Sequence, residues 1–166
     1  MKLTVRHTFD CTPEQFWQML WDPEYERRMQ STGTARRELI ETRDEGALKV
    51  FRYKLTSEKP LPGPVAKVVG ATNLSYEQVN KYNAQSSLLQ WKVIPSVMAD
   101  KVTSEGTFVV KPIAGGCERL VDGNITVKIL LIGGKVEQAI INDVQQAYEL
   151  AAKISREYIA EKFKKP

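Results

Sequence analysis

Residues 133–164 read GGKVEQAIINDVQQAYELAAKISREYIAEKFK. After its two glycines the run contains neither Gly nor Pro, so it predicts one helix of roughly 45 Å. Apolar residues recur at spacings of three and four and share one face: Val136, Ile140, Val144, Ala147, Ala151, Ile154 and Tyr158. The other face is polar, and Glu149 and Lys153 are expected to pair there as i,i+4 partners. An apolar stripe of this length needs a wide partner surface.

The segments before this helix have the pattern of strands. Seven of them combine β-forming residues with alternation of apolar and polar side chains, and turn residues separate them: 3–10, 34–43, 49–56, 73–82, 87–95, 102–111 and 118–131. Short connections and alternation predict antiparallel hairpins with one face in water. Residues 57–71 hold three prolines and two glycines. They predict a loop, with a helical turn over 65–69, that lies over the cavity as a lid.

Two short helices are predicted between the first and second strands. Thr12 is a good N-cap, Pro13 fits the first helical position, and Gln15 completes a capping box. Asp22-Pro23 ends this helix and caps a second one. The two helices form a V-shaped unit.

This order predicts an α+β fold. A seven-stranded, curved antiparallel sheet wraps around the long C-terminal helix, and residues 1–166 form a single domain. One helix cannot fill so wide a curved sheet, so we expect a cavity between them. The two short helices are expected to close one end of it.

The composition is typical of a globular domain and does not indicate a membrane-spanning or secreted protein. The chain has 166 residues, of which 42% are hydrophobic and 27% charged, as in ordinary globular domains. It contains no apolar run of about 18 residues, and its first ten residues alternate rather than form a signal peptide. Cys11 and Cys117 are expected to be free thiols in a reducing compartment, with a disulfide as the minority alternative. The expected location is the cytoplasm.

The net charge of +4 is mildly basic and spread out. A nucleic-acid partner is not expected, because no basic stripe with aromatic residues or known motif is present. The basic clusters are Arg27-Arg28, Arg36-Arg37 and the tail residues Lys162, Lys164 and Lys165. Solubility is the plain interpretation of these clusters. The alternative is transient docking of Arg27, Arg28, Arg36 and Arg37 onto an anionic membrane surface.

The order of elements resembles the helix-grip fold of the START-like (SRPBCC, Bet v 1-like) superfamily. Two sequence stretches carry the resemblance: Thr12-Pro13-Glu14-Gln15-Phe16-Trp17 followed by Asp22-Pro23, and GNITVKI at 123–129 followed by LIGGKVE at 131–137. The second stretch is similar to the bacterial DUF2505 family, and also to the sterol-binding VASt domain. The resemblance implies a cavity for a hydrophobic ligand rather than a catalytic signature. Residues 34–115 match no motif.

The sequence contains no clear set of catalytic or metal-binding residues. A single histidine, His7, and two distant cysteines give no metal-ligand spacing, and no nucleophile or phosphate-loop motif occurs. We therefore expect no metal and no cofactor. His7 shares a strand face with Val5 and Phe9. It is interpreted either as a buried histidine bonded to a neighbour or as a polar anchor for a ligand.

The sequence thus predicts a non-enzymatic carrier or sensor that binds a hydrophobic small molecule, such as a lipid, sterol, quinone or polyketide. The expected ligand contacts are His7, Tyr53, Tyr76, Leu89, Trp91, Phe108, Val144 and Tyr148. Sheet core is the competing interpretation for Trp91, Phe108 and Tyr53. Two alternative functions remain, an enzyme of the cyclase or aromatase kind and a membrane-surface interaction module. A monomer or weak dimer is expected.

Overall fold

The computed structural model describes residues 1–33 and 35–163. Its elements are β1 (Lys2–Phe9), α1 (Pro13–Leu20), α2 (Pro23–Gln30), β2 (Ala35–Glu45), β3 (Leu48–Ser57), α3 (Gly63–Val69), β4 (Ser75–Asn83), β5 (Leu88–Pro95), β6 (Val102–Ile113), β7 (Gly116–Val127) and α4 (Gly133–Lys162). Thr34, the predicted start of the second strand, and the tail residues Lys164 and Lys165 lie outside the described residues.

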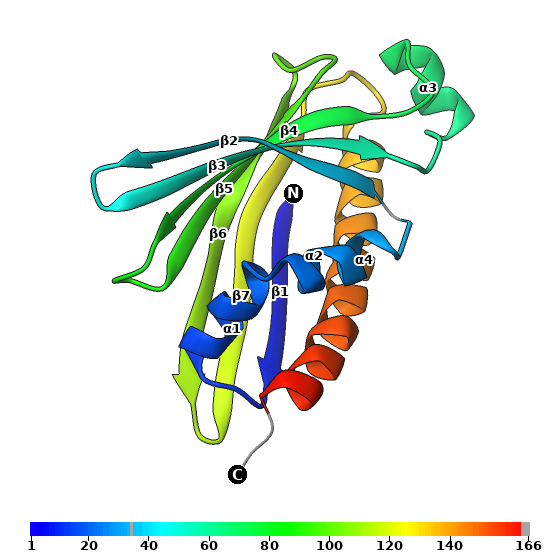
Figure 1. Ribbon diagram of the computed structural model, residues 1–166. Coiled ribbons are helices and arrows are strands. Elements are labelled where there is room, and N and C mark those ends of the chain that lie inside the picture. Colours follow the sequence, from blue (N-terminus) through cyan, green and yellow to red (C-terminus); the bar gives the residue numbers. More distant parts are fainter. Residues whose placement is uncertain (34, 164–166) are drawn as a thin grey trace.

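All the strands named above join one antiparallel sheet. Its order is β1-β7-β6-β5-β4-β3-β2, so the first strand pairs with the last and all other neighbouring strands are consecutive in the sequence. Figure 1 shows the sheet curling around α4, with α1 and α2 crossing its concave side. The predicted α+β helix-grip fold is confirmed.

The two short helices begin where their caps predict. Thr12 Oγ1 accepts from the Gln15 amide while the Gln15 side chain accepts from the Thr12 amide, which completes the capping box. The Asp22 side chain accepts from the Glu24 amide and caps α2. Helix α2 is fastened to α4 by two tyrosines: Tyr25 bonds Ser155, and Tyr158 donates to Asp22.

Helix α4 begins at Gly133 as predicted, and the reason is steric. A Cβ on Gly133 would lie 2.3 Å from the carbonyl oxygen of Val127. Strand β7 ends at this Val127, four residues before the predicted end at Leu131. The predicted apolar stripe is also partly wrong, because Ala147 is exposed while Ile141, Ala152 and Ile159 are buried.

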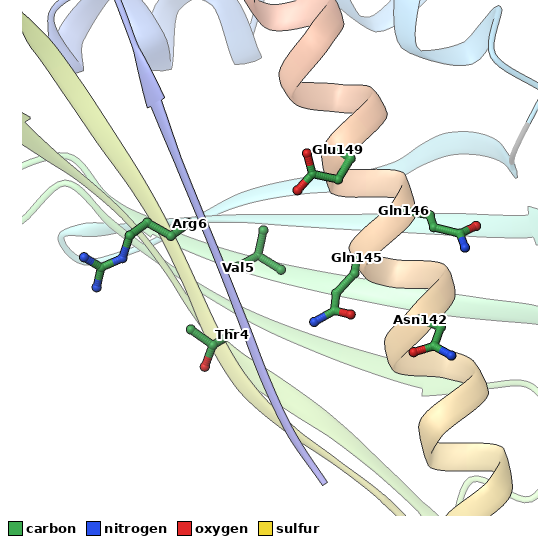
Figure 2. A pocket seen from close by; sticks show the side chains of 7 residues that line it. All are labelled: Thr4, Val5, Arg6, Asn142, Gln145, Gln146 and Glu149. Carbon is green, nitrogen blue, oxygen red and sulfur yellow. The ribbon is translucent and has the colours of Figure 1, made fainter.

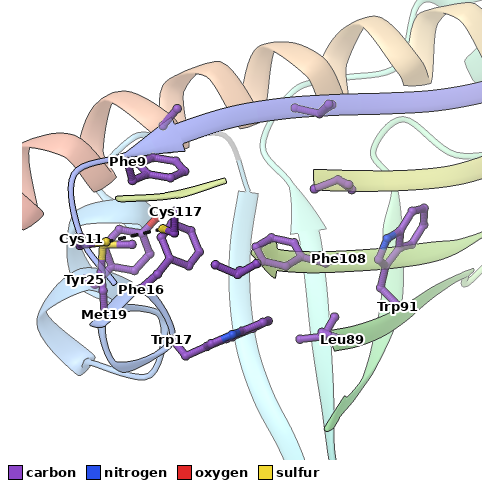
Figure 3. Close-up of a cluster of buried hydrophobic side chains, with 14 of the residues drawn as sticks. Phe9, Cys11, Phe16, Trp17, Met19, Tyr25, Leu89, Trp91, Phe108 and Cys117 are labelled. Atoms are coloured by element: carbon purple, nitrogen blue, oxygen red, sulfur yellow. Dashed lines mark hydrogen bonds between the residues drawn. The ribbon is translucent and has the colours of Figure 1, made fainter. Parts of the chain in front are cut away.

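The core is densest where α1 and the end of β1 meet β6 and β7 (Figure 3). Rings of Phe9 and Phe16 lie 4.8 Å apart, and those of Trp17 and Phe108 lie 5.5 Å apart. Cys11 and Cys117 are free, buried thiols with their sulfurs 3.8 Å apart in this cluster. The neighbouring Cys11, followed by burial, raises the pKa of the Cys117 thiol, while the bond to Cys117 lowers the pKa of Cys11.

Two glycines make room for Trp91 on the concave face. Gly106 and Gly123 are opposite one another on β6 and β7, and Gly106 also faces Trp91 on β5. An added Cβ would lie 2.6 Å from the indole at Gly106 and 2.4 Å from it at Gly123. The large ring therefore lies over the backbone of both neighbouring strands.

We expect Gly106→Ala to lower the free energy of unfolding by about 1–3 kcal/mol, because overpacking forces backbone shifts. The new Cβ would lie 2.0 Å from the carbonyl oxygen of Asp122, which belongs to the backbone. Gly134→Ala is the matched control, since nothing lies within 4 Å of its Cβ position. Urea denaturation measures both variants, and equal stability of the two would contradict this packing.

Candidate ligand-binding site

An open hollow lies between the α1–α2 unit and strands β2, β3 and β4. Its volume is about 690 Å³. Residues of the short helices and of the three strands line it: Leu20, Trp21, Asp22, Pro23, Glu26, Gln30, Arg37, Leu39, Lys49, Phe51, Tyr53 and Tyr82. We call it the aromatic hollow, because four of these side chains are aromatic.

The aromatic side chains of the hollow stack on one another. Trp21 follows the last residue of α1, and its ring lies 4.7 Å from that of Phe51, nearly parallel at 21°. Tyr82 meets the edge of Trp21 at 5.4 Å, and Phe51 continues to Tyr53 at 6.4 Å. Neither Trp21 nor Phe51 belongs to the buried core cluster. Trp17 of the core packs against Trp21 and Tyr82, and the wall borders the open space of the hollow.

Arg37 supplies a cationic group at this wall. Its guanidinium lies over the Tyr53 ring, 3.7 Å from the centroid, and its Nη1 pairs with Glu26 at 3.4 Å, so the ring face and the carboxylate share the cation. Burial raises the pKa of Tyr53 and keeps its hydroxyl protonated. The Nε of Arg37 is buried and has no acceptor among the described residues. The hollow therefore combines an aromatic wall with a cationic side chain among its lining residues.

A second hollow, the polar groove, lies on the other side of the molecule between edge strand β1 and α4 (Figure 2). Its volume is about 420 Å³, and mainly polar side chains line it: Thr4, Val5, Arg6, Asn142, Gln145, Gln146 and Glu149. Such a lining suits water better than an apolar ligand.

A chain of charged and polar groups runs from this groove into the interior. Nη2 of Arg119 donates to Nδ1 of His7 at 2.8 Å and to the backbone carbonyl of Tyr148 at 3.2 Å. Because Nδ1 accepts, the ring proton is on Nε2, which donates to Glu149 at 2.9 Å. The Arg119 side chain is only 1% exposed, and within residues 1–33 and 35–163 no carboxylate pairs with it directly. The Arg119 guanidinium lies 4.9 Å from the centroid of the Tyr148 ring and 5.2 Å from that of the Phe9 ring.

Burial affects the protonation of His7 and Arg119. Burial, followed by the charge of Arg119, lowers the pKa of His7, and the bond to Glu149 opposes that shift only in part. Burial also lowers the pKa of Arg119. The arrangement therefore holds a neutral imidazole between a guanidinium and a carboxylate.

Arg119 is a site residue that was not predicted, and Glu149 has a different partner from the predicted one. The signal for Arg119 was present, since it shares the inward parity of Val121 and Ile125 on β7. Glu149 was expected to pair with Lys153, but the structure pairs it with His7. His7 is thus bonded through both ring nitrogens, which agrees with the buried-histidine interpretation.

The predicted ligand contacts fall in different places. Tyr53 lines the aromatic hollow, and Tyr76 is half-buried on β4. The others belong to the packed interior or lie against it: Leu89, Trp91 and Phe108 in the core cluster, Val144 and Tyr148 beside it, and His7 in the polar chain. Their role as ligand contacts stays a prediction.

The predicted lid and the basic clusters are also placed by the structure. No residue of 57–71 lines either hollow, and α3 has no buried residue. Arg28 is held by Glu24 and Glu161, and Arg37 by Glu26. Arg27 and Arg36 are exposed. Membrane docking of these arginines stays a prediction.

Sheet, short-helix unit and long helix together define a protein with the helix-grip fold. The model of the family described as "Protein of unknown function (DUF2505)" matches residues 4–159, and the chain belongs to this family. No match was found among curated proteins. No helix in the described part of the chain is long and apolar enough to cross a bilayer.

Solved structures share the fold at low sequence identity. TTHA0849 from Thermus thermophilus has a TM-score of 0.68 at 15% identity, over 97% of this chain and 98% of that one. The Zhui aromatase/cyclase from Streptomyces sp. R1128 has a TM-score of 0.65 at 10% identity, over 99% and 96%. Protein Ms6760 from Mycobacterium smegmatis has a TM-score of 0.62 at 10% identity, over 96% and 91%. At these identities the likeness concerns the fold alone.

The hydrogen bonds that join Arg119, His7 and Glu149 predict that the stability of the protein depends on pH. Folding lowers the pKa of His7 below its ordinary value near 6.5, so between the two values the unfolded chain binds more protons. The free energy of unfolding should therefore fall as the pH drops through the ordinary value. Urea denaturation at neutral and mildly acidic pH measures this fall.

His7→Asn is the variant that isolates the effect, because its side-chain oxygen can still accept from Arg119 without titrating. We expect a smaller loss of stability on acidification in this variant than in the wild type. An identical pH dependence in both proteins would show that His7 does not control it.

Proposed function

We propose that the protein binds a hydrophobic small molecule in the aromatic hollow. The observation that carries this proposal is the stacked wall of Trp21, Phe51 and Tyr53, which borders about 690 Å³ of open space. That volume lies within the range of about 300–1,000 Å³ typical of small-molecule sites. Trp21 is exposed and Phe51 is half-buried, so an apolar ligand that covers these two rings removes apolar surface from water.

The polar part of the hollow indicates what the ligand carries. The guanidinium of Arg37 belongs to the lining of the hollow, so we expect an oxygen of the ligand to pair with this cation. A fatty acid, sterol, quinone or polyketide-like molecule combines such an oxygen with an apolar body. The expected role is transport or sensing, and the expected location in the cytoplasm stays a prediction.

Catalysis of the cyclase or aromatase kind is the second candidate. The fold is similar to that of the Zhui aromatase/cyclase, and the carboxyl groups of Asp22 and Glu26 line the hollow. Both groups have partners, Asp22 with Tyr158 and Glu26 with Arg37. An acid or base for catalysis needs access to the substrate, so these bonds favour binding over catalysis.

Titration with the fluorescent fatty acid cis-parinaric acid tests the proposal. We expect saturable binding by the wild type and roughly tenfold weaker binding by Phe51→Ala, which removes a stacking ring from the wall. Ile113→Ala is the control, because Ile113 is an exposed apolar residue on the β6–β7 hairpin, outside the lining of the hollow. Binding that is absent in the wild type, or equal in Phe51→Ala and the control, would contradict the proposal.

A further inference from the structure

The turn between β7 and α4 exposes two adjacent leucines. Leu130 is 87% exposed and Leu131 92%, the highest values among the large hydrophobic residues of the described chain. Single exposed leucines are common on protein surfaces, but two neighbours that project almost fully into solvent are unusual. Their exposure needs a reason other than packing.

The turn that carries them is held in place. The Gly133 amide donates to the Ile129 carbonyl at 2.9 Å and closes the turn, and the Lys128 amide donates to the Lys101 carbonyl in the β5–β6 loop at 2.8 Å. Leu131 has a φ of 69°, a left-handed conformation that branched side chains rarely adopt. Strained residues persist where the surrounding structure fixes them, and they gather at functional positions. The leucines are thus presented by a fixed turn.

Basic residues surround the leucines. Lys101, Lys128 and Lys135 are exposed, and none of them has an ion pair within residues 1–33 and 35–163. Asp100 is the exposed acid beside them, while Glu137 is bonded to the Val127 amide. The β7–α4 connection and the adjoining β5–β6 loop therefore carry three lysines without an ion pair among the described residues.

The neighbouring loops extend this surface. Figure 1 shows the β7–α4 turn, the β5–β6 loop and α3 at one end of the molecule, away from the β6–β7 hairpin. Val68 of α3 is 47% exposed at the same end. These segments and the two leucines therefore lie at one end of the molecule.

We propose that this end docks onto a bilayer surface that contains anionic phospholipid. The leucines enter the boundary between head groups and acyl chains, and the lysines meet the lipid phosphates. A protein partner fits less well, because protein interfaces favour aromatic anchors on surfaces of larger area. This docking surface is independent of the aromatic hollow and places membrane contact at the other end from Arg27 and Arg28.

Co-sedimentation with vesicles tests the docking surface in the full chain. The vesicles contain phosphatidylcholine with an equal share of phosphatidylserine, and pure phosphatidylcholine vesicles serve as the neutral comparison. The test variant is Leu130→Ser/Leu131→Asn, because Asn tolerates the left-handed conformation and leaves the turn intact. The matched control, Ile40→Ser/Ile113→Ser, removes two exposed apolar residues elsewhere.

We expect the wild type and the control to bind anionic vesicles, and the leucine variant to bind about tenfold or more weakly. Lys101→Gln/Lys128→Gln/Lys135→Gln should bind weakly and lose most of the dependence on salt. Unchanged urea denaturation curves show that the variants are folded.

Three results would overturn the proposal. The first is a wild type that ignores both kinds of vesicle, and the second is equal binding by the leucine variant and the control. The third is a wild-type dimer that the leucine variant abolishes without any effect on vesicles, since a second copy of the chain would then cover the leucines. Size-exclusion chromatography on the same samples detects that dimer.

Discussion

One helix has to cover a sheet that is too wide for it. An α-helix with its side chains is about 10 Å across and strands are about 4.8 Å apart, so a helix lying along the strands covers about two of them. In this protein α4 packs on β1 and β7, the pair formed by the first and last strands. The remaining strands need another cover, and the short-helix unit supplies it only in part. The aromatic hollow is the space that results.

The anchoring of α2 keeps this space open. Tyr25 and Tyr158 tie α2 and its cap Asp22 to the C-terminal half of α4. Trp21, next to that cap, is thereby held above Phe51 on the sheet. The roof of the hollow is fixed from the α4 side, while its floor belongs to strands that α4 does not reach. Ligand binding here needs no rearrangement of the packed core around the α1 end of the sheet.

Much of the fold was predictable from the sequence, because its signals are local. The structure confirms the element boundaries indicated by the glycines at the start of α4, the capping box at Thr12 and the Asp22-Pro23 break. Alternation also indicated the faces of the strands. The predictions were wrong where the local pattern does not determine burial. Ala147 has the spacing of the apolar stripe, but it is exposed in the structure. Likewise, the alternation continues to Leu131, whereas strand β7 ends at Val127.

The site was less predictable for the same physical reason. Alternation tells which side chains face inward, but only packing decides which inward positions meet other side chains and which meet open space. Trp91 and Tyr53 have the same pattern in sequence, yet Trp91 lies on two glycines of the core and Tyr53 borders the hollow. Arg119 was overlooked because an inward cation contradicts the usual composition of a core.

Indole N–H resonances of Trp17, Trp21 and Trp91 offer the most direct measurement of where a ligand sits. In a nuclear magnetic resonance titration with a fatty acid, the account predicts a large shift for Trp21, which borders the hollow, and a constant position for Trp91 in the core. A shift of Trp91 with Trp21 unmoved, or no shift of either, would contradict it.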